Sequence, residues 1–295
     1  MTYKSGFVTI IGRPNVGKST LMNRLVGEKI AIISDKPQTT RNRIQTVYTD
    51  ENMQAIFLDT PGIHKPKNKL GDYMVSVSTE TLGEVDLILW LVDESVEIGP
   101  GDKYILEQIQ DIKTPKILVV NKVDKIPIDK IQGIIDSYSE FGVFEDIVAI
   151  SATMGSGVED LMKKIRETLP EGPQYFPEDT LTDQPERVIV SEIIREKALL
   201  YLEDEVPHGV AVGIESMKKR PKKDLVDIDA VIYCERDSHK GIIIGKGGRK
   251  LKGIGKSARE DIERLLGSQV NLKVWVKVEK NWRDKEKFIK QFGYI

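Results

Sequence analysis

The segment Gly12-Arg13-Pro14-Asn15-Val16-Gly17-Lys18-Ser19 constrains this chain more than any other part of its sequence. It follows an apolar run at 7–11, which predicts a strand, and it precedes a helix that we expect to begin at Lys18. In this context a glycine-rich loop surrounds a polyphosphate with backbone N–H groups, its lysine contacts the β and γ phosphates, and its serine hydroxyl binds Mg²⁺. The pattern therefore predicts a nucleoside-triphosphate site that extends from residue 12 to Thr20, with Ser19 as a magnesium ligand.

A second segment, Asp59-Thr60-Pro61-Gly62, follows the apolar run at 55–58. It therefore lies at the carboxyl end of a predicted strand, where open α/β sheets bind their ligands. We expect Asp59 to lie in the outer shell of the magnesium ion and the backbone N–H of Gly62 to face the γ phosphate. The predicted site also includes three neighbouring residues, Thr60, Pro61 and Ile63.

The third segment, Asn121-Lys122-Val123-Asp124, follows the apolar run at 117–120 and predicts which base is bound. The carboxylate of Asp124 can accept hydrogen bonds from the N1–H and the exocyclic amine of guanine, and adenine has no such pair of donors. A pocket that leaves this carboxylate unpaired with the wrong base discriminates strongly. We expect Ser151 and Ala152 to donate backbone N–H groups to the guanine carbonyl. Alone, the pattern also fits a solvated turn, but its order after the other two segments favours GTP and GDP.

In this order, the three segments resemble the motifs of the translation-factor-like GTPases and, among these, of the bacterial Era family. Residues 37–41, Pro-Gln-Thr-Thr-Arg, are similar to the first switch of that group. The resemblance implies that the hydroxyl of Thr40 completes the magnesium shell when the γ phosphate is present. Without the other motifs, the pair Thr39-Thr40 would be interpreted as an ordinary threonine pair before a strand, with no role in ligand binding.

Ile63 departs from the pattern of many GTPases, which carry a glutamine here that orients the attacking water. The isoleucine side chain cannot form a hydrogen bond with water, so we expect slow GTP hydrolysis. The catalytic group stays unassigned, and we expect Lys18 and Asn15 to support catalysis. Asn15 resembles an asparagine that holds a monovalent cation in related GTPases, where K⁺ would stabilise developing charge. Asn15 equally fits a turn residue that stabilises the loop itself.

The composition predicts a cytoplasmic protein with two domains. A chain of 295 residues can hold two cores, and its one cysteine, Cys234, excludes an intramolecular disulfide framework. The first six residues lead directly into the first predicted strand, so we expect no signal peptide. The apolar runs are no longer than a strand, and the three histidines show no spacing suited to a metal: His64, His208 and His239.

Four of the 13 prolines, at 170, 173, 177 and 185, fall in one short acidic and polar stretch, which predicts a domain boundary. We expect a GTPase domain at 1–172, a linker at 173–186 and a second domain at 187–295. In the first part strands and helices alternate, which predicts a mostly parallel α/β sheet with helices on both faces. The second part predicts a small α+β domain: helix (191–203), strand (210–217), strand (225–235), two short helices and strand (270–278).

The second part is basic, although the whole chain has a net charge of −2. Residues 240–290 carry 15 basic and six acidic side chains, an excess typical of a nucleic-acid partner. At the centre of this stretch, residues 245–248 fit Gly-x-x-Gly, the loop by which KH domains hold about four nucleotides of single-stranded RNA. The predicted RNA-binding residues are Ile244, Gly245, Lys246, Gly247, Gly248, Arg249 and Lys250.

The order of elements around this loop resembles the type 2 KH domain. We expect five apolar residues to form the wall of its groove and the core of its two helices: Ile242, Ile243, Ile244, Leu251 and Ile254. The other interpretation is a glycine-rich connection between helices with solvated lysines. The tail at 282–292 predicts an amphipathic helix that packs on the KH sheet, and weak contact of its lysines with anionic lipid stays open.

The resemblance to Era covers essentially the whole chain. It implies a GTP-controlled factor with Mg²⁺ as cofactor that binds the single-stranded 3′ end of 16S rRNA and acts in assembly of the small (30S) ribosomal subunit. It also implies weak, partial association with the inner face of the cell membrane. Two rivals are a signalling GTPase whose second domain binds protein, and a tRNA-modifying GTPase. The latter needs a catalytic cysteine, and Cys234 lies in the middle of a predicted strand.

Overall fold

The computed structural model describes residues 2–27, 31–32, 40–41, 43–61, 68–94, 97–203 and 206–294. The chain forms two compact units, and the main division in the sequence falls between Asp183 and Gln184. Each unit has its own hydrophobic core. No helix within the described ranges is both long enough and apolar enough to span a bilayer.

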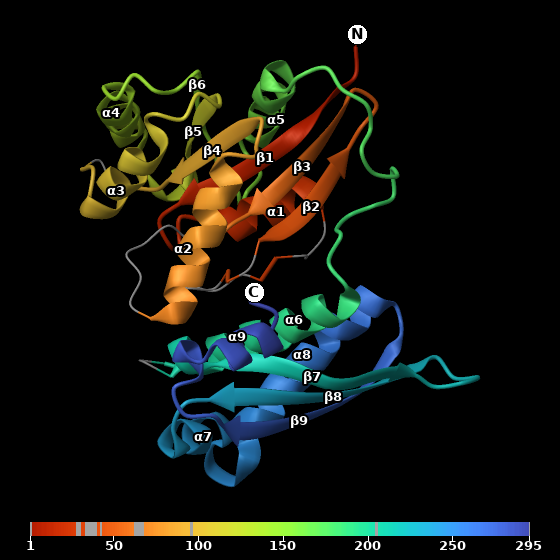
Figure 1. The fold of residues 1–295 in the computed structure, drawn as a ribbon. Helices are drawn as coiled ribbons and strands as arrows, with labels where there is room; N and C mark the ends of the chain where they lie inside the picture. The colour runs from red at the N-terminus through yellow and green to blue at the C-terminus, as the bar shows by residue number, and fades with distance from the viewer. Residues whose placement is uncertain are drawn as a thin grey trace. The chain divides into compact units, whose positions relative to one another are not determined.

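The first unit is built on a six-stranded sheet in the order β2-β3-β1-β4-β5-β6 (Figure 1). All neighbouring strands are parallel except β2 and β3, which form an antiparallel pair at one edge. The sequence pattern did not predict β2. The strands are β1 (Lys4–Gly12), β2 (Ile44–Thr49), β3 (Met53–Asp59), β4 (Leu87–Val92), β5 (Lys116–Val120) and β6 (Asp146–Ala149).

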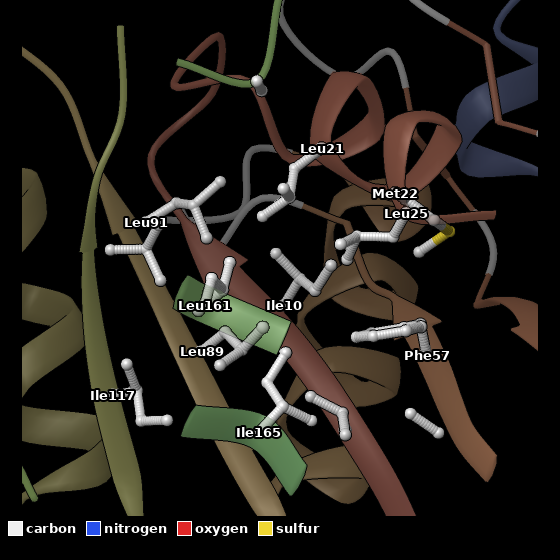
Figure 2. Packing of buried hydrophobic residues seen from close by; sticks show 14 of the residues in the cluster. Ile10, Leu21, Met22, Leu25, Phe57, Leu89, Leu91, Ile117, Leu161 and Ile165 are labelled. Carbon is white, nitrogen blue, oxygen red and sulfur yellow. The ribbon is translucent and has the colours of Figure 1, made fainter. Parts of the chain in front are cut away.

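Helices cover both faces of this sheet, because consecutive strand residues point to opposite sides. Ile10 packs in one core with residues of α1 and α5, and Ile11 packs in the other core with residues of α2, α3 and α4. Figure 2 shows the first core, in which Leu21 and Leu161 approach the sheet from different helices. The helices are α1 (Lys18–Val26), α2 (Lys69–Leu82), α3 (Pro100–Ile109), α4 (Ile128–Ser139) and α5 (Val158–Thr168). The predicted α/β class is confirmed.

The second unit has a three-stranded sheet in the order β7-β8-β9, with β7 antiparallel and β9 parallel to β8. Its core joins the sheet to α6 and α8, and buried residues of α8 recur every four positions at Ile254, Ala258 and Ile262. The elements are α6 (Glu186–Tyr201), β7 (Ala211–Lys219), β8 (Leu225–Cys234), α7 (Asp237–Ile244), α8 (Arg249–Leu266), β9 (Gln269–Val278) and α9 (Glu286–Gln291).

Two helices of this unit differ from the prediction. The first begins at Glu186 rather than at 191, directly after Pro185, whose fixed φ suits the start of a helix. The helix after the glycine-rich loop was expected to be short, but α8 has 18 residues. Gly253 does not interrupt it, because the absence of a side chain lets the Tyr201 ring pack there: a Cβ would lie 2.9 Å from Tyr201 Cε1.

The segment predicted as a linker is hydrogen-bonded to the first unit along much of its length. The backbone N–H groups of Tyr175 and Phe176 both donate to Gln54 Oε1, at 2.7 and 2.9 Å. Further along, Val47 N donates to the carbonyl of Leu181 at 2.9 Å, and Thr182 Oγ1 donates to the carbonyl of Gln45 at 2.6 Å. The segment therefore lies against the edge strand β2 before α6 begins.

Candidate nucleotide-binding site and RNA interface

The phosphate loop lies between the end of β1 at Gly12 and the start of α1 at Lys18. The Lys18 ammonium donates to two carbonyls of this loop, those of Gly12 at 3.0 Å and Arg13 at 2.9 Å. Burial lowers the pKa of Lys18 to about 8, although the nearby Asp59 carboxylate acts in the opposite direction. A cation kept in so little water is strongly attracted to phosphate.

Three oxygens predicted to bind magnesium lie together beside the phosphate loop. Ser19 Oγ donates to Asp59 Oδ2 at 2.9 Å, and Thr40 Oγ1 lies 3.2 Å from both Asp59 Oδ2 and Ser19 Oγ. Asp59 is fully buried, which raises the pKa of its carboxyl group. Its other oxygen, Oδ1, is buried without a hydrogen-bond partner among the described residues. Hard oxygen donors with an unused carboxylate oxygen fit Mg²⁺.

Asn121 connects the base-recognition segment to both neighbouring loops. Its Nδ2 donates to the carbonyl of Val16 in the phosphate loop at 2.8 Å, and its Oδ1 accepts the backbone N–H of Ala152 at 3.0 Å. Gly17 lies so close that a Cβ there would be 2.3 Å from Asn121 Nδ2. The three loops are therefore joined through one buried side chain.

The carboxylate of Asp124, which is predicted to recognise guanine, is oriented by a hydrogen bond from a serine side chain. Ser151 Oγ donates to Asp124 Oδ1 at 2.6 Å. The backbone N–H groups that we expected to serve the guanine carbonyl have partners inside the protein: Ser151 N donates to the carbonyl of Ser156, and Ala152 N donates to Asn121. The tertiary structure thus brings Asp124 and the 151–152 segment together, but the backbone N–H groups of Ser151 and Ala152 are hydrogen-bonded to other protein groups.

The Gly-x-x-Gly loop connects α7, which ends at Ile244, to α8, which begins at Arg249. Gly245 has φ +71°, and a Cβ on it would lie 2.7 Å from the Cβ of Lys250, so this position requires glycine. Lys246 and Arg249 are exposed beside the loop. An open backbone turn flanked by cations has the features needed to approach a sugar-phosphate chain closely.

The apolar residues around this loop divide between core and surface. Ile243 and Ile254 are fully buried, and Ile244 and Leu251 pack against the same core. Ile242 was predicted with them, but it is 44% exposed and does not belong to the core. Successive residues of an α-helix point in different directions, so Ile242 meets solvent although its neighbour Ile243 is buried.

Comparison with known proteins agrees with this geometry. A family model described as 50S ribosome-binding GTPase matches residues 7–122, and a KH-domain model matches residues 205–283. GTPase Era of Alkaliphilus metalliredigens is 62% identical over 294 residues, which span 100% of both chains. GTPase Era of Clostridioides difficile is 65% identical over 293 residues, 99% of each chain. The chain belongs to the Era GTPase family.

Solved Era structures have the same fold. A crystal structure of Era in complex with MgGDPNP and nucleotides 1506–1542 of 16S ribosomal RNA gives a TM-score of 0.96 at 43% identity, covering 99% of both chains. Aquifex aeolicus Era bound to GDP and AlF₄⁻ gives 0.95 at 43% identity, also covering 99% of both. The resemblance to Era and the GTPase activity that it implies are thereby confirmed.

Some predicted residues lie outside the part of the chain that the structure describes. Gly62 and Ile63 belong to 62–67, and most of the first switch belongs to 33–39. The adjoining residues Thr40 and Pro61 are described, and both are buried. The proposed roles of Gly62 and Ile63 therefore stay predictions.

Three residues near the site were not found by sequence reasoning. Arg24 in α1 donates through Nε to the carbonyl of Ala152 at 3.0 Å and through Nη2 to the carbonyl of Thr153. These two bonds fix the position of the loop that carries Ser151 and Ala152. Asp93 and Asp102 form ion pairs with Arg13. Each of these residues is distant in sequence from its partner, so no local sequence pattern predicts the contact.

The tail packs on the KH sheet as expected, although its helix is shorter than predicted. The α-helix covers only Glu286–Gln291, after a 3₁₀ turn at Trp282–Asp284. Trp282 is fully buried and donates through Nε1 to the carbonyl of Gly209 at 2.8 Å, while the Phe292 and Tyr233 ring centroids lie 4.7 Å apart. Since the apolar side of the tail is used in this packing, the exposed residues of 282–292 are charged or polar.

Proposed function

We propose that this Era-family chain is a GTP-controlled RNA-binding factor that acts in assembly of the small ribosomal subunit. The observation that carries the proposal is the presence in one chain of two loops built for phosphates. One precedes α1 beside a cluster of magnesium-type oxygens, and the other precedes α8 in a KH fold. The Era structure with nucleotides 1506–1542 of 16S ribosomal RNA supports the 3′ end of that RNA as the ligand.

The proposed GTP site comprises the phosphate loop from Gly12 to Thr20, residues 59–63, residues 121–124 and the 151–152 pair. Lys18 pairs with the phosphates, and Asp124 accepts hydrogen bonds from guanine. Ser19 and Asp59 would hold Mg²⁺, with Thr40 joining them in the GTP state. When bound, the ion would supply positive charge that offsets the negative charge of the phosphates. Ser19→Ala is expected to remove magnesium-dependent tight binding of GTP, measured by titration with and without Mg²⁺.

Because Ile63 cannot orient the attacking water, we propose that a potassium ion held near Asn15 would assist GTP hydrolysis by stabilising the developing negative charge. Asn15 has φ +67°, a left-handed conformation that turns the loop backbone at this point. We expect faster GTP hydrolysis in potassium than in sodium chloride at equal ionic strength, and no such difference in Asn15→Ala. Equal rates of the wild type in both salts would leave Asn15 as a turn residue only.

RNA binding is tested with a substitution in the Gly-x-x-Gly loop. Lys246→Asp with Gly247→Asp places two negative side chains where phosphates must approach, so affinity for a 3′-end 16S rRNA oligonucleotide should fall at least tenfold while GTP binding is retained. The matched control is Lys290→Asp with Gly293→Asp. It also replaces an exposed lysine and an exposed glycine of positive φ in the same unit.

Affinity for the same oligonucleotide also distinguishes this proposal from a signalling GTPase whose second unit binds protein. The wild type should bind the oligonucleotide more tightly with a nonhydrolysable GTP analogue than with GDP, and affinity should fall as salt rises, because basic side chains displace counterions. Equal affinity in both nucleotide states would refute the coupling alone. RNA binding that is weak, insensitive to salt and unchanged by the loop substitutions would favour a protein ligand for the second unit.

For localisation, the proposal is a cytoplasmic protein with weak electrostatic contact with the membrane. Such contact depends on exposed tail lysines, because the apolar side of the tail is buried. The lysines are Lys285, Lys287 and Lys290. Sedimentation with anionic vesicles that is weak and disappears at high salt would support this, and sedimentation with neutral vesicles would contradict it.

A further inference from the structure

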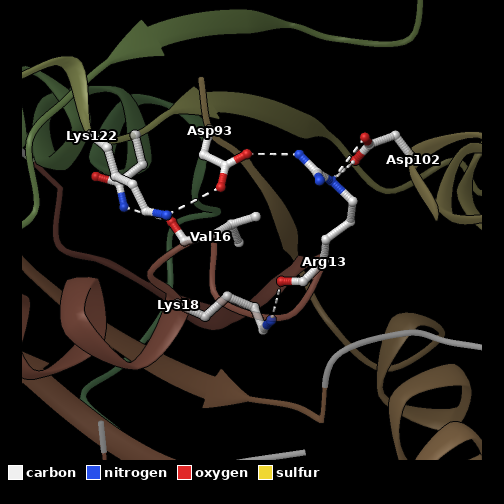
Figure 3. Close-up of polar contacts among 7 residues, drawn as sticks. Arg13, Val16, Lys18, Asp93, Asp102 and Lys122 are labelled. Atoms are coloured by element: carbon white, nitrogen blue, oxygen red, sulfur yellow. Dashed lines mark hydrogen bonds and ion pairs between the residues drawn. The ribbon is translucent and has the colours of Figure 1, made fainter. Parts of the chain in front are cut away.

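The side chain of Arg13 in the phosphate loop makes two ion pairs (Figure 3). Its Nε lies 2.9 Å from Asp102 Oδ2 in the first turn of α3, and its Nη2 lies 2.7 Å from Asp93 Oδ1, directly after β4. Gly101 leaves room for this arrangement, since a Cβ there would lie 3.1 Å from Arg13 Cδ. The Arg13 side chain thereby ties the phosphate loop to α3 and to the end of β4.

Asp93 also binds a second cation from the base-recognition segment. Lys122 Nζ lies 3.1 Å from Asp93 Oδ2, so the two oxygens of one carboxylate serve two different loops. Lys122 adopts a left-handed backbone conformation with φ +65° at this point. The same carboxylate therefore fixes a side chain adjacent to the phosphate subsite and one within the base subsite.

The four charged groups compensate one another in a poorly hydrated place. The Asp102 side chain is 1% exposed and that of Asp93 is 16% exposed, whereas Arg13 and Lys122 are 29% and 27% exposed. Burial raises the pKa of Asp102 while the Arg13 guanidinium opposes that rise. Loss of one member of such a group leaves an unpaired charge, which costs more than the contact itself contributes.

We propose that Asp93 is a positioning residue for nucleotide binding. By holding Arg13 and Lys122 on one carboxylate, it sets the separation between phosphate loop and base segment before a nucleotide arrives. Preorganisation of this kind increases affinity by reducing the ordering that binding requires. The proposal rests on the nucleotide site proposed above, and it adds a charged connection to the Asn121 bridge.

Release of a fluorescent GDP analogue from the full-length protein tests this inference. Asp93→Asn keeps the shape of the side chain but holds two cations poorly, and we expect GDP release to accelerate about tenfold. Asp86→Asn is the matched control. Asp86 is a carboxylate of the same unit that accepts the backbone N–H of Phe7 at 2.8 Å, at the other end of β1 from the phosphate loop. Its substitution should lower thermal stability without accelerating release.

A double-mutant cycle separates positioning from general destabilisation. If Arg13 acts partly through Asp93, Arg13→Gln should accelerate release less in the Asp93→Asn background than in the wild type. Additive effects, or release from Asp93→Asn no faster than from Asp86→Asn, would overturn the inference. Failure of the nucleotide site itself gives a different result, because Lys18→Ala would then retain wild-type GDP affinity.

Discussion

Asn121 Nδ2 donates a hydrogen bond of 2.8 Å to the carbonyl of Val16, and this contact joins the base-recognition segment to the phosphate loop across 105 positions of sequence. Both groups are buried, so neither can exchange its partner for water. We therefore expect nucleotide affinity to depend on this hydrogen bond, although it joins two groups of the protein.

Replacement of Asn121 by alanine should weaken binding of every nucleotide that reaches the phosphate loop. The change removes the bonds to Val16 and Ala152 and leaves their buried backbone groups unpaired, at a cost of about 2 kcal/mol or about 30-fold in affinity. Equilibrium titration with GDP measures this. Gln132→Ala is the control, because the exposed amide of Gln132 donates to an exposed α4 neighbour, Asp136. Wild-type affinity in Asn121→Ala would contradict the bridging role.

Gly17→Ala should abolish tight nucleotide binding. Gly17 has φ +104°, and an added Cβ would lie 2.3 Å from Asn121 Nδ2, so the loop must move or the bridge must break. Gly27→Ala separates the two causes. Gly27 has φ +80°, and no atom of the described residues lies within 4 Å of the added Cβ, so this substitution should cost about 1 kcal/mol of stability without loss of GDP affinity. Similar GDP affinity in the two variants would show that the clash is unimportant.

Asp124→Asn should change base preference from guanine to xanthine. The carboxylate accepts two hydrogen bonds, whereas the amide accepts one and donates one, which matches the second carbonyl of xanthine. We expect GTP affinity to fall about a hundredfold or more and XTP affinity to rise, as measured by competition. Ser151 Oγ, 2.6 Å from Asp124 Oδ1, can serve either side chain. GTP and XTP affinities that fall together would contradict guanine recognition by this residue.

Nucleotide affinity should decrease as pH rises above about 8. The pKa of Lys18 is lowered to about 8 in the protein without nucleotide, chiefly by burial, and phosphates will raise it in the complex. The attraction is therefore complete below the pKa of the free protein and is progressively lost above it. GDP affinity measured from pH 7 to 9 should show this decline. Lys18→Arg should show a smaller decline, because guanidinium does not titrate in this range.

Much of the GTPase site could be predicted because its chemistry is local in sequence. The phosphate loop must place glycine, lysine and serine within eight positions, and the Gly-x-x-Gly loop needs its first and last glycines three positions apart. Both loops lie in the structure where the flanking apolar runs placed them, between β1 and α1 and between α7 and α8. Helix length was less predictable, since the helix after this loop was expected to be short, whereas α8 has 18 residues and its Gly253 lies beside the Tyr201 ring of α6.

The sequence by itself determined the order of the motifs, the α/β class of the first unit and the KH character of the second, because these depend on short-range spacing and apolar periodicity. Which side chains hold the motifs together depends instead on the three-dimensional packing of the strands and helices. Asp93 and Asp102 meet Arg13 from 80 and 89 positions away, and Ala152 meets Arg24 from 128 positions away. Such contacts are set by the strand order β3-β1-β4-β5-β6, which brings the strand ends to one edge of the sheet, and no local pattern carries that information.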